Sequence, residues 1–338
     1  MSGYGIGDIE TVAWLVVFLG VIPWVGFGIA QLNSLAVARF VGWSWVAVAV
    51  LFVERMSVNE PSGTRMLLVI GALLWSMKAV VYFESRQQGR YELKWWQWLG
   101  FCVGWVGMRA EAFKQVPALP LADWKGYIQR GILRVLAGSA LVAAAWIVAH
   151  GVFNPGGLTQ AEEIETSRRW AATGLLLPGL SLVVHFGLFN ILTGVWRYFG
   201  ARCTSLFRAP LLSKSLTEFW GRRWNLAFSE MTALAVFRPL KQLPGRPEQV
   251  TMLATIAGFL FSGLLHELAI SVPVGAGYGL PLLYFAIHGV GIVLEKRLAF
   301  LSSPWLGRIW TMAWVLLPLP ILFHRPFLEG CVWPIIGI

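Results

Sequence analysis

The chain has 338 residues, of which 57% are hydrophobic and only 13% are charged. Soluble proteins average about 25% charged residues, so the composition excludes an ordinary soluble domain and indicates an integral membrane protein. Nineteen tryptophans, a residue that favours membrane interfaces, agree with this. The formal net charge is +10. No aromatic-basic motif typical of nucleic-acid binding accompanies that charge, so the partners it predicts are anionic membrane lipids or an anionic cofactor.

Apolar runs follow one another along the chain. A helix needs roughly 20 apolar residues to cross the hydrocarbon core of a bilayer. We predict membrane spans near residues 11–30, 36–53, 66–83, 95–109, 131–150, 171–197, 251–269, 279–295 and 306–323. The 95–109 run is short, which favours a tilted or re-entrant segment. The expected fold is an all-α, multi-pass membrane protein of about nine transmembrane helices plus interfacial amphipathic helices, forming a single domain over residues 1–338.

The connectors between these runs differ in charge. The 198–250 connector holds eight Lys or Arg against three Glu, whereas the 151–170 loop combines a turn at 154–157 with an acidic patch of Glu162, Glu163 and Glu165. Cytoplasmic loops carry an excess of Lys and Arg, so we predict that the 198–250 connector is cytoplasmic. The 110–130 connector and residues 296–297 then fall on the same side. With nine spans, the N-terminus lies inside and the C-terminus outside.

A basic and aromatic segment lies within this connector. Residues 219–225, called the cassette below, read Phe-Trp-Gly-Arg-Arg-Trp-Asn. Ser215 and Glu218 have the spacing of a capping box, which predicts a helix start. A continuous helix would place Glu218, Arg222, Asn225 and Ser229 on one side. Its arginines could contact phosphates, or the segment could be an interfacial anchor with snorkelling arginines.

His266 lies inside the apolar run 259–268. A histidine at hydrocarbon depth is costly unless it has a partner or a function. Ser262 and Gly263 share its helix face and are small, so another helix or a substrate can approach closely. A neutral imidazole there is suited to act as a general base on a hydroxyl, although a purely structural hydrogen bond is the alternative. Glu267 points about 100° away from that face, and its role stays open.

Two further histidines lie in apolar runs. His185 and His288 could line the same cavity, could pair as haem or metal ligands, or could serve only in helix–helix hydrogen bonds. The sequence has no HExxH spacing, no GxSxG elbow and no Walker loop, and its three cysteines are scattered. We therefore predict no metal site.

The sequence at 218–225, Glu-Phe-Trp-Gly-Arg-Arg-Trp-Asn, followed by His266 in its apolar run, resembles the membrane-bound O-acyltransferases, in particular the branch that includes plant wax synthases. The resemblance covers residues 215–225 and 261–267, with 105–108 as a weaker landmark. It implies a helical scaffold around a buried reaction chamber. In that chamber Asn225 and His266 form the active site, with His266 as the general base.

The resemblance also implies the substrates. Acyl-CoA would be the co-substrate, with no bound cofactor, and the acceptor would be a hydroxyl compound, favouring a long-chain alcohol. A sterol, a diacylglycerol, a glycan or a small metabolite remain open as acceptors. The residues expected to bind substrate are Trp220, Arg222, Arg223, Trp224, Ser262 and His288. A membrane transporter is the non-enzymatic alternative, but it would predict repeated halves and paired broken spans, which this sequence does not show.

Overall fold

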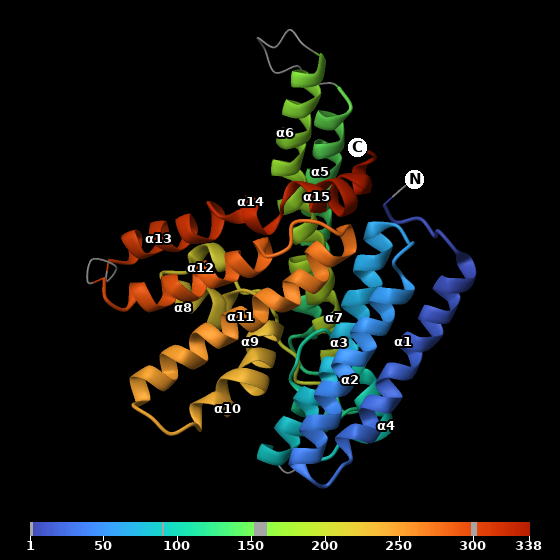
Figure 1. Ribbon diagram of the computed structural model, residues 1–338, viewed down its shortest axis with the longest axis vertical. Helices are drawn as coiled ribbons and strands as arrows, with labels where there is room; N and C mark the ends of the chain where they lie inside the picture. Colours follow the sequence, from blue (N-terminus) through green and yellow to red (C-terminus); the bar gives the residue numbers. More distant parts are fainter. Residues whose placement is uncertain (1–2, 90, 152–160, 299–302) are drawn as a thin grey trace. The chain divides into compact units, whose positions relative to one another are not determined.

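The computed structural model describes residues 3–89, 91–151, 161–298 and 303–338. In these ranges every regular element is a helix (Figure 1), which confirms the predicted all-α class. Seven helical segments are long and apolar enough to cross a membrane. They are α1 (Ile9–Ala30), α2 (Leu35–Met56), α3 (Ser62–Gly89), α5 (Trp124–Ala149), the continuous segment Glu165–Tyr198, α11 (Pro247–Val274), and Pro304–Leu322, which comprises α13 (Pro304–Leu316) and α14 (Leu319–Leu322).

Two of the nine predicted spans are shorter. α12 (Leu280–Glu295) is apolar and has 16 residues, whereas α4 (Trp95–Cys102) has only eight. At 1.5 Å per residue α4 is about 12 Å long, too short to cross the hydrocarbon core. The chain then turns and forms the short helix η1 (Ala110–Phe113). The expectation of an unusual segment at 95–109 is therefore correct, and α4 does not count as a full span.

The packing divides the chain into two compact units. The first comprises residues 3–114 and 207–328, and the second comprises residues 115–206 and 329–338. The single domain predicted for residues 1–338 stays a prediction.

In the first unit, α1, α2 and α3 lie side by side, and α11 packs against both α3 and α12. α3 is the most buried of the candidate spans, with 67% of its apolar window inside the protein. Local sequence explains the helix starts. Asp8 accepts hydrogen bonds from the backbone N–H groups of Glu10 and Thr11, and Ser34 accepts one from Val37, as N-cap residues do.

In the second unit, α5 packs along α6 (Ala161–Ser181), a π-helical turn (Leu182–Leu188) and α7 (Phe189–Tyr198). Glycines allow this close approach: a Cβ atom added at Gly138 would lie only 2.7 Å from the carbonyl oxygen of Gly179. His185 belongs to this unit, and its Nδ1 lies 3.2 Å from Ser181 Oγ on the same helix. The predicted turn at 154–157 lies outside the described residues.

Candidate functional site

The cassette begins at a capped helix, as predicted. Ser215 Oγ accepts a hydrogen bond of 2.9 Å from the backbone N–H of Glu218 at the start of α8 (Leu216–Glu218). A second cap comes from the end of α12, where the Glu295 carboxylate accepts from the backbone N–H groups of Leu216 and Thr217 at 2.7 and 3.0 Å. Glu295 therefore fixes α8, which leads into the cassette, to the end of α12, a link that local sequence patterns did not predict.

The predicted continuous helix through the cassette is wrong. α8 widens into a π-helical turn (Phe219–Arg223), and the backbone becomes extended at Trp224 and left-handed at Asn225, with φ 43° and ψ 63°. A new helix, α9 (Leu226–Thr232), begins there, and Asn225 Oδ1 caps it by accepting from the N–H of Phe228 at 3.5 Å. Asn tolerates the left-handed conformation and is a preferred N-cap. The four residues expected on one helix face are therefore divided between two helices.

The two neighbouring arginines have different surroundings. Arg223 forms an ion pair of 2.6 Å with Glu218 and donates to the carbonyl oxygens of Arg208 and Ala209 at 3.3 and 3.2 Å. These contacts hold the loop before the cassette against its π-helical turn. Arg222 is exposed and faces a cavity. The sequence placed both in a substrate-binding set, and the structure leaves only Arg222 oriented toward open space.

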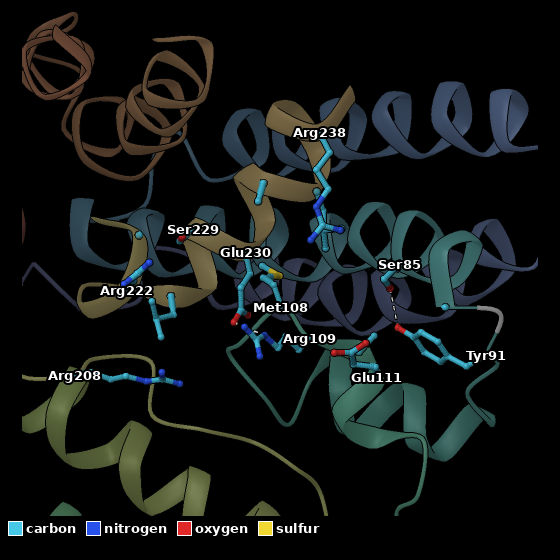
Figure 2. A pocket seen from close by; sticks show the side chains of 16 residues that line it. Ser85, Tyr91, Met108, Arg109, Glu111, Arg208, Arg222, Ser229, Glu230 and Arg238 are labelled. Atoms are coloured by element: carbon cyan, nitrogen blue, oxygen red, sulfur yellow. Dashed lines mark hydrogen bonds and ion pairs between the residues drawn. The ribbon is translucent and has the colours of Figure 1, made fainter. Parts of the chain in front are cut away.

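That cavity has a volume of about 790 Å³ and is lined by residues from the end of α3, the turn at 108–111, the cassette and α9 (Figure 2). Arg109, Arg208, Arg222 and Arg238 are exposed on its wall, against Glu111 and Glu230, so the wall is net positive. Sequence reasoning missed this cavity because its lining combines segments that are far apart in the chain.

Two of the residues that line the cavity, Arg109 and Glu230, form an ion pair. Arg109 Nε lies 2.6 Å from Glu230 Oε1, as Figure 2 shows. Burial raises the pKa of the Glu230 carboxyl above its ordinary value of 4.5, and the positive charge of Arg109 opposes this rise. The Arg109 side chain therefore joins the turn after α4 to α9.

Lys78 holds the turn from which Arg109 extends. This lysine is fully buried on α3, and its ammonium donates to the carbonyl oxygens of Phe101, Trp105 and Gly107 at 3.0, 2.9 and 2.6 Å. A buried ammonium is tolerated when its three donors are satisfied in this way. Sequence reasoning missed Lys78, although a lone lysine in an apolar run is a usable signal.

His266 lies on α11 with one ring nitrogen engaged. Its Nδ1 is 2.7 Å from the carbonyl oxygen of Ser262, and because a carbonyl can only accept, Nδ1 carries the proton. Nε2 therefore keeps its lone pair. The half-buried ring lies against Phe285 and Phe228, with centroid distances of 4.3 and 5.0 Å. The result is a neutral proton acceptor in an aromatic environment.

Trp220 connects the cassette to the same environment. The centroid of its ring lies 5.5 Å from that of Phe285 and 5.2 Å from that of His288, and the Phe285 ring in turn packs on His266. His288 is fully buried, with Nδ1 2.8 Å from the carbonyl oxygen of Tyr284. The structure thus brings Trp220, His266 and His288 into one aromatic cluster, and their roles in catalysis and substrate binding stay predictions.

Asn225 and Ser262 reach this cluster through α9. Asn225 caps the N–H of Phe228, whose ring packs on His266. Thr232, at the other end of α9, lies 3.5 Å from the hydroxyl of Ser262. One short helix therefore connects the two halves of the predicted site.

Trp224 and Glu267 have structural positions. The Trp224 ring stacks on Phe219 and meets Phe207 edge-on, with ring-centroid distances of 5.6 and 5.0 Å. Glu267 is buried and its Oε1 accepts from the backbone N–H of Leu282 at 3.0 Å, in the first turn of α12. The open question about Glu267 is answered in part: its carboxylate joins α11 to α12.

Comparison with known proteins places the cassette and His266 in one family segment. Residues 203–286 match the model of the family described as "Membrane bound O-acyl transferase family". The chain is 32% identical over 136 residues to "Probable long-chain-alcohol O-fatty-acyltransferase 9" of Arabidopsis thaliana, covering 37% of this chain and 40% of that protein. It is 32% identical over 93 residues to "Long-chain-alcohol O-fatty-acyltransferase" of Simmondsia chinensis, covering 26% of each. The chain therefore spans less than half the length of these relatives.

Proposed function

We propose that this chain is a membrane-bound O-acyltransferase of the wax-synthase-like branch, as its matches to that family and to long-chain-alcohol O-fatty-acyltransferases support, and that it transfers an acyl group from acyl-CoA to the hydroxyl of a long-chain alcohol. The observation that carries the proposal is the free Nε2 of His266 in an aromatic cluster that includes the cassette residue Trp220. A sterol, a diacylglycerol, a glycan or a small metabolite is the alternative acceptor on the same scaffold.

The reaction proceeds through a single proton acceptor. Nε2 of His266 takes the proton of the acceptor hydroxyl while the oxygen attacks the thioester carbonyl carbon. The new C–O bond forms, the C–S bond breaks, and the CoA thiolate leaves and takes the proton from His266. Phe228 and Phe285 pack on the ring, and Trp220 packs on Phe285; these aromatic side chains limit the access of water, which protects the thioester from hydrolysis.

The arginine-lined cavity is suited to the head of the donor. Guanidinium groups bind phosphates through paired hydrogen bonds, and Arg222 is exposed on a net positive wall. Ser229 and Glu230 of α9 line this cavity, whereas Phe228 of the same helix packs on His266. An acyl-CoA with its phosphates in the cavity and its thioester near His266 would therefore pass around α9. Asn225, which caps α9, acts as a positioning residue in this arrangement.

The test is acyl transfer by the purified protein, followed as CoA release with a panel of acyl-CoA donors and acceptors. We expect His266→Ala to lose activity by a factor of about 10²–10⁴ while the protein still accumulates in membranes. His150→Ala is a matched control, because its Nδ1 makes the same bond to the carbonyl four residues earlier, at 3.0 Å, on an exposed surface. Normal turnover by folded His266→Ala would remove this residue from the mechanism.

A second experiment separates the arginines. Arg222→Gln is expected to weaken the apparent affinity for acyl-CoA with little effect on melting temperature. Arg223→Gln is expected to lower the melting temperature, because it breaks the pair with Glu218 and the bonds to the 208–209 carbonyls. Unchanged affinity for acyl-CoA in both variants would assign these charges to lipid anchoring instead.

We also propose that the 198–250 connector is cytoplasmic, where acyl-CoA is found. Because α4 is too short to span, five candidate spans precede this connector, and the N-terminus moves to the non-cytoplasmic side while the basic connectors stay together. Cysteines introduced at Glu163 and at Arg246 should differ in labelling by an impermeant reagent in intact cells. Equal labelling would contradict this topology and the cytoplasmic donor route.

A further inference from the structure

The first half of α5 carries cations that lack acidic partners. Lys125, Arg130 and Arg134 lie on this helix, and none of them forms an ion pair with a carboxylate in the described part of the second unit. The acid at this end of α5, Asp123, is already paired with Arg197 at 2.6 Å. Among the described residues of the second unit, the positive charge at this helix end is therefore not neutralised.

Arg130 and Arg134 form a pair on one face of α5. They are four residues apart, a spacing that brings like charges together and destabilises the helix. Arg130 lies over the ring of Tyr127 at 5.0 Å, and Arg134 lies over Phe186 at 5.8 Å and donates to its carbonyl oxygen at 3.5 Å. Each guanidinium has five N–H donors, so most donors of both side chains remain available.

The surroundings of the pair are apolar. Only 11% of the apolar window of α5 is buried in the protein, and Leu133 and Leu136 are 66% and 62% exposed. Arg134 lies about 15 Å along the helix from Trp124, an aromatic residue of the kind that marks the membrane interface. A charge at that depth is costly unless it reaches the head groups or gains a counter-ion.

We propose that Arg130 and Arg134 bind the phosphate of an anionic phospholipid, whose acyl chains lie along Leu133 and Leu136. The lipid supplies the negative charge that the protein lacks here and covers the exposed leucines. A free phosphate would supply only the charge. This site lies in the second unit and does not depend on the proposed acyl transfer.

The test measures lipid retention by the full-length purified protein with native mass spectrometry. The probes are dioleoyl phosphatidylglycerol and dioleoyl phosphatidylcholine at matched concentration, with inorganic phosphate as a separate arm. We expect the wild type to retain phosphatidylglycerol in preference to phosphatidylcholine. The double variant Arg130→Gln, Arg134→Gln should bind phosphatidylglycerol roughly 30-fold more weakly, which is a little over fivefold for each of the two cations. Arg55→Gln is the control, because Arg55 is also exposed near a span end.

Three results would overturn the proposal. They are unchanged phosphatidylglycerol binding in the folded double variant, equal retention of both lipids by the wild type, and displacement of the lipid by an equal concentration of inorganic phosphate. If the double variant does not fold, the salt dependence of phosphatidylglycerol binding by the wild type tests the proposal instead. Binding to the head group weakens as ionic strength rises, and salt-independent retention of phosphatidylglycerol would contradict the site.

Discussion

The buried ammonium of Lys78 provides a sharp test of how the turn after α4 is held. Lys78→Met keeps an unbranched side chain of similar length but removes the charge and all three N–H donors. The carbonyl oxygens of Phe101, Trp105 and Gly107, now 2.6–3.0 Å from Nζ, would lose this partner. The contact of the ammonium with the Phe101 ring, at 4.0 Å, would also be lost.

The expected loss of stability in Lys78→Met is the difference between opposing contributions to the free energy of folding. A hydrogen bond from a charged donor contributes about 1.5–3 kcal/mol, but dehydration of the buried ammonium offsets part of that sum. Breaking a buried, satisfied charge cluster typically costs about 3–5 kcal/mol. Because Met fills much of the same volume, we expect the lower part of that range. The melting temperature should fall by on the order of 10 °C.

The assay is thermal unfolding of the detergent-purified protein, followed by tryptophan fluorescence. Lys241→Met is a matched control, because Lys241 is exposed and its ammonium lies over the Phe237 ring, 5.7 Å from the ring centroid. Little change in melting temperature is expected for this variant. In Lys78→Met, the apparent affinity for acyl-CoA should also weaken, since Arg109 extends from the same turn. A melting temperature equal to that of the wild type would refute the argument that Lys78 holds the turn.

Other predictions concern single positions. Asn225→Gly keeps the left-handed backbone and loses only the cap, so it should destabilise by a few tenths of a kcal/mol, whereas Asn225→Ala adds about 1–2 kcal/mol of backbone strain; denaturant unfolding distinguishes them, and equal losses would contradict the assigned backbone. Gly138→Ala should lower the melting temperature, because the new Cβ would meet the Gly179 carbonyl at 2.7 Å, while Gly174→Ala, with no atom within 4 Å, should not. Arg109→Gln should raise the pKa of Glu230 further. A carboxyl whose pKa is raised in the folded state contributes stability that is present below the unfolded pKa and is lost as pH rises through the folded pKa. This variant should therefore lose more stability than the wild type as pH rises above the ordinary value of 4.5. Identical pH profiles of the two proteins would contradict this explanation.

The helical class and some local features of the candidate site could be predicted from local sequence. Long apolar runs require helices in a bilayer, and Ser215 caps its helix as the spacing indicated. The small residue Ser262 and the ring of His266 do lie where another element approaches, since Thr232 and Phe228 of α9 contact them. The patterns behind these predictions are local, although the contacts with α9 join residues 30 positions or more apart.

The remaining features depend on contacts that local patterns do not contain. Helical periodicity assumes an unbroken helix, so it missed the left-handed Asn225, whose side chain ends one helix and begins another. The short α4 follows from a lysine more than 20 residues earlier that binds the carbonyls of the turn. The cavity needs Arg109, Arg208 and Arg238 from separate segments to meet, which is a tertiary result.

The hydrogen bond that orients His266 has a consequence for how this site can change over time. Its acceptor is the main-chain carbonyl of Ser262, one helical turn earlier, rather than a carboxylate on another element. No side-chain substitution at position 262 removes that oxygen. The tautomer of the ring is therefore protected against most point mutations, while its neighbours Phe228 and Phe285 are free to vary in size. If the chain has the proposed function, selectivity for different acceptors can diversify around His266 without altering which of its nitrogens receives the proton.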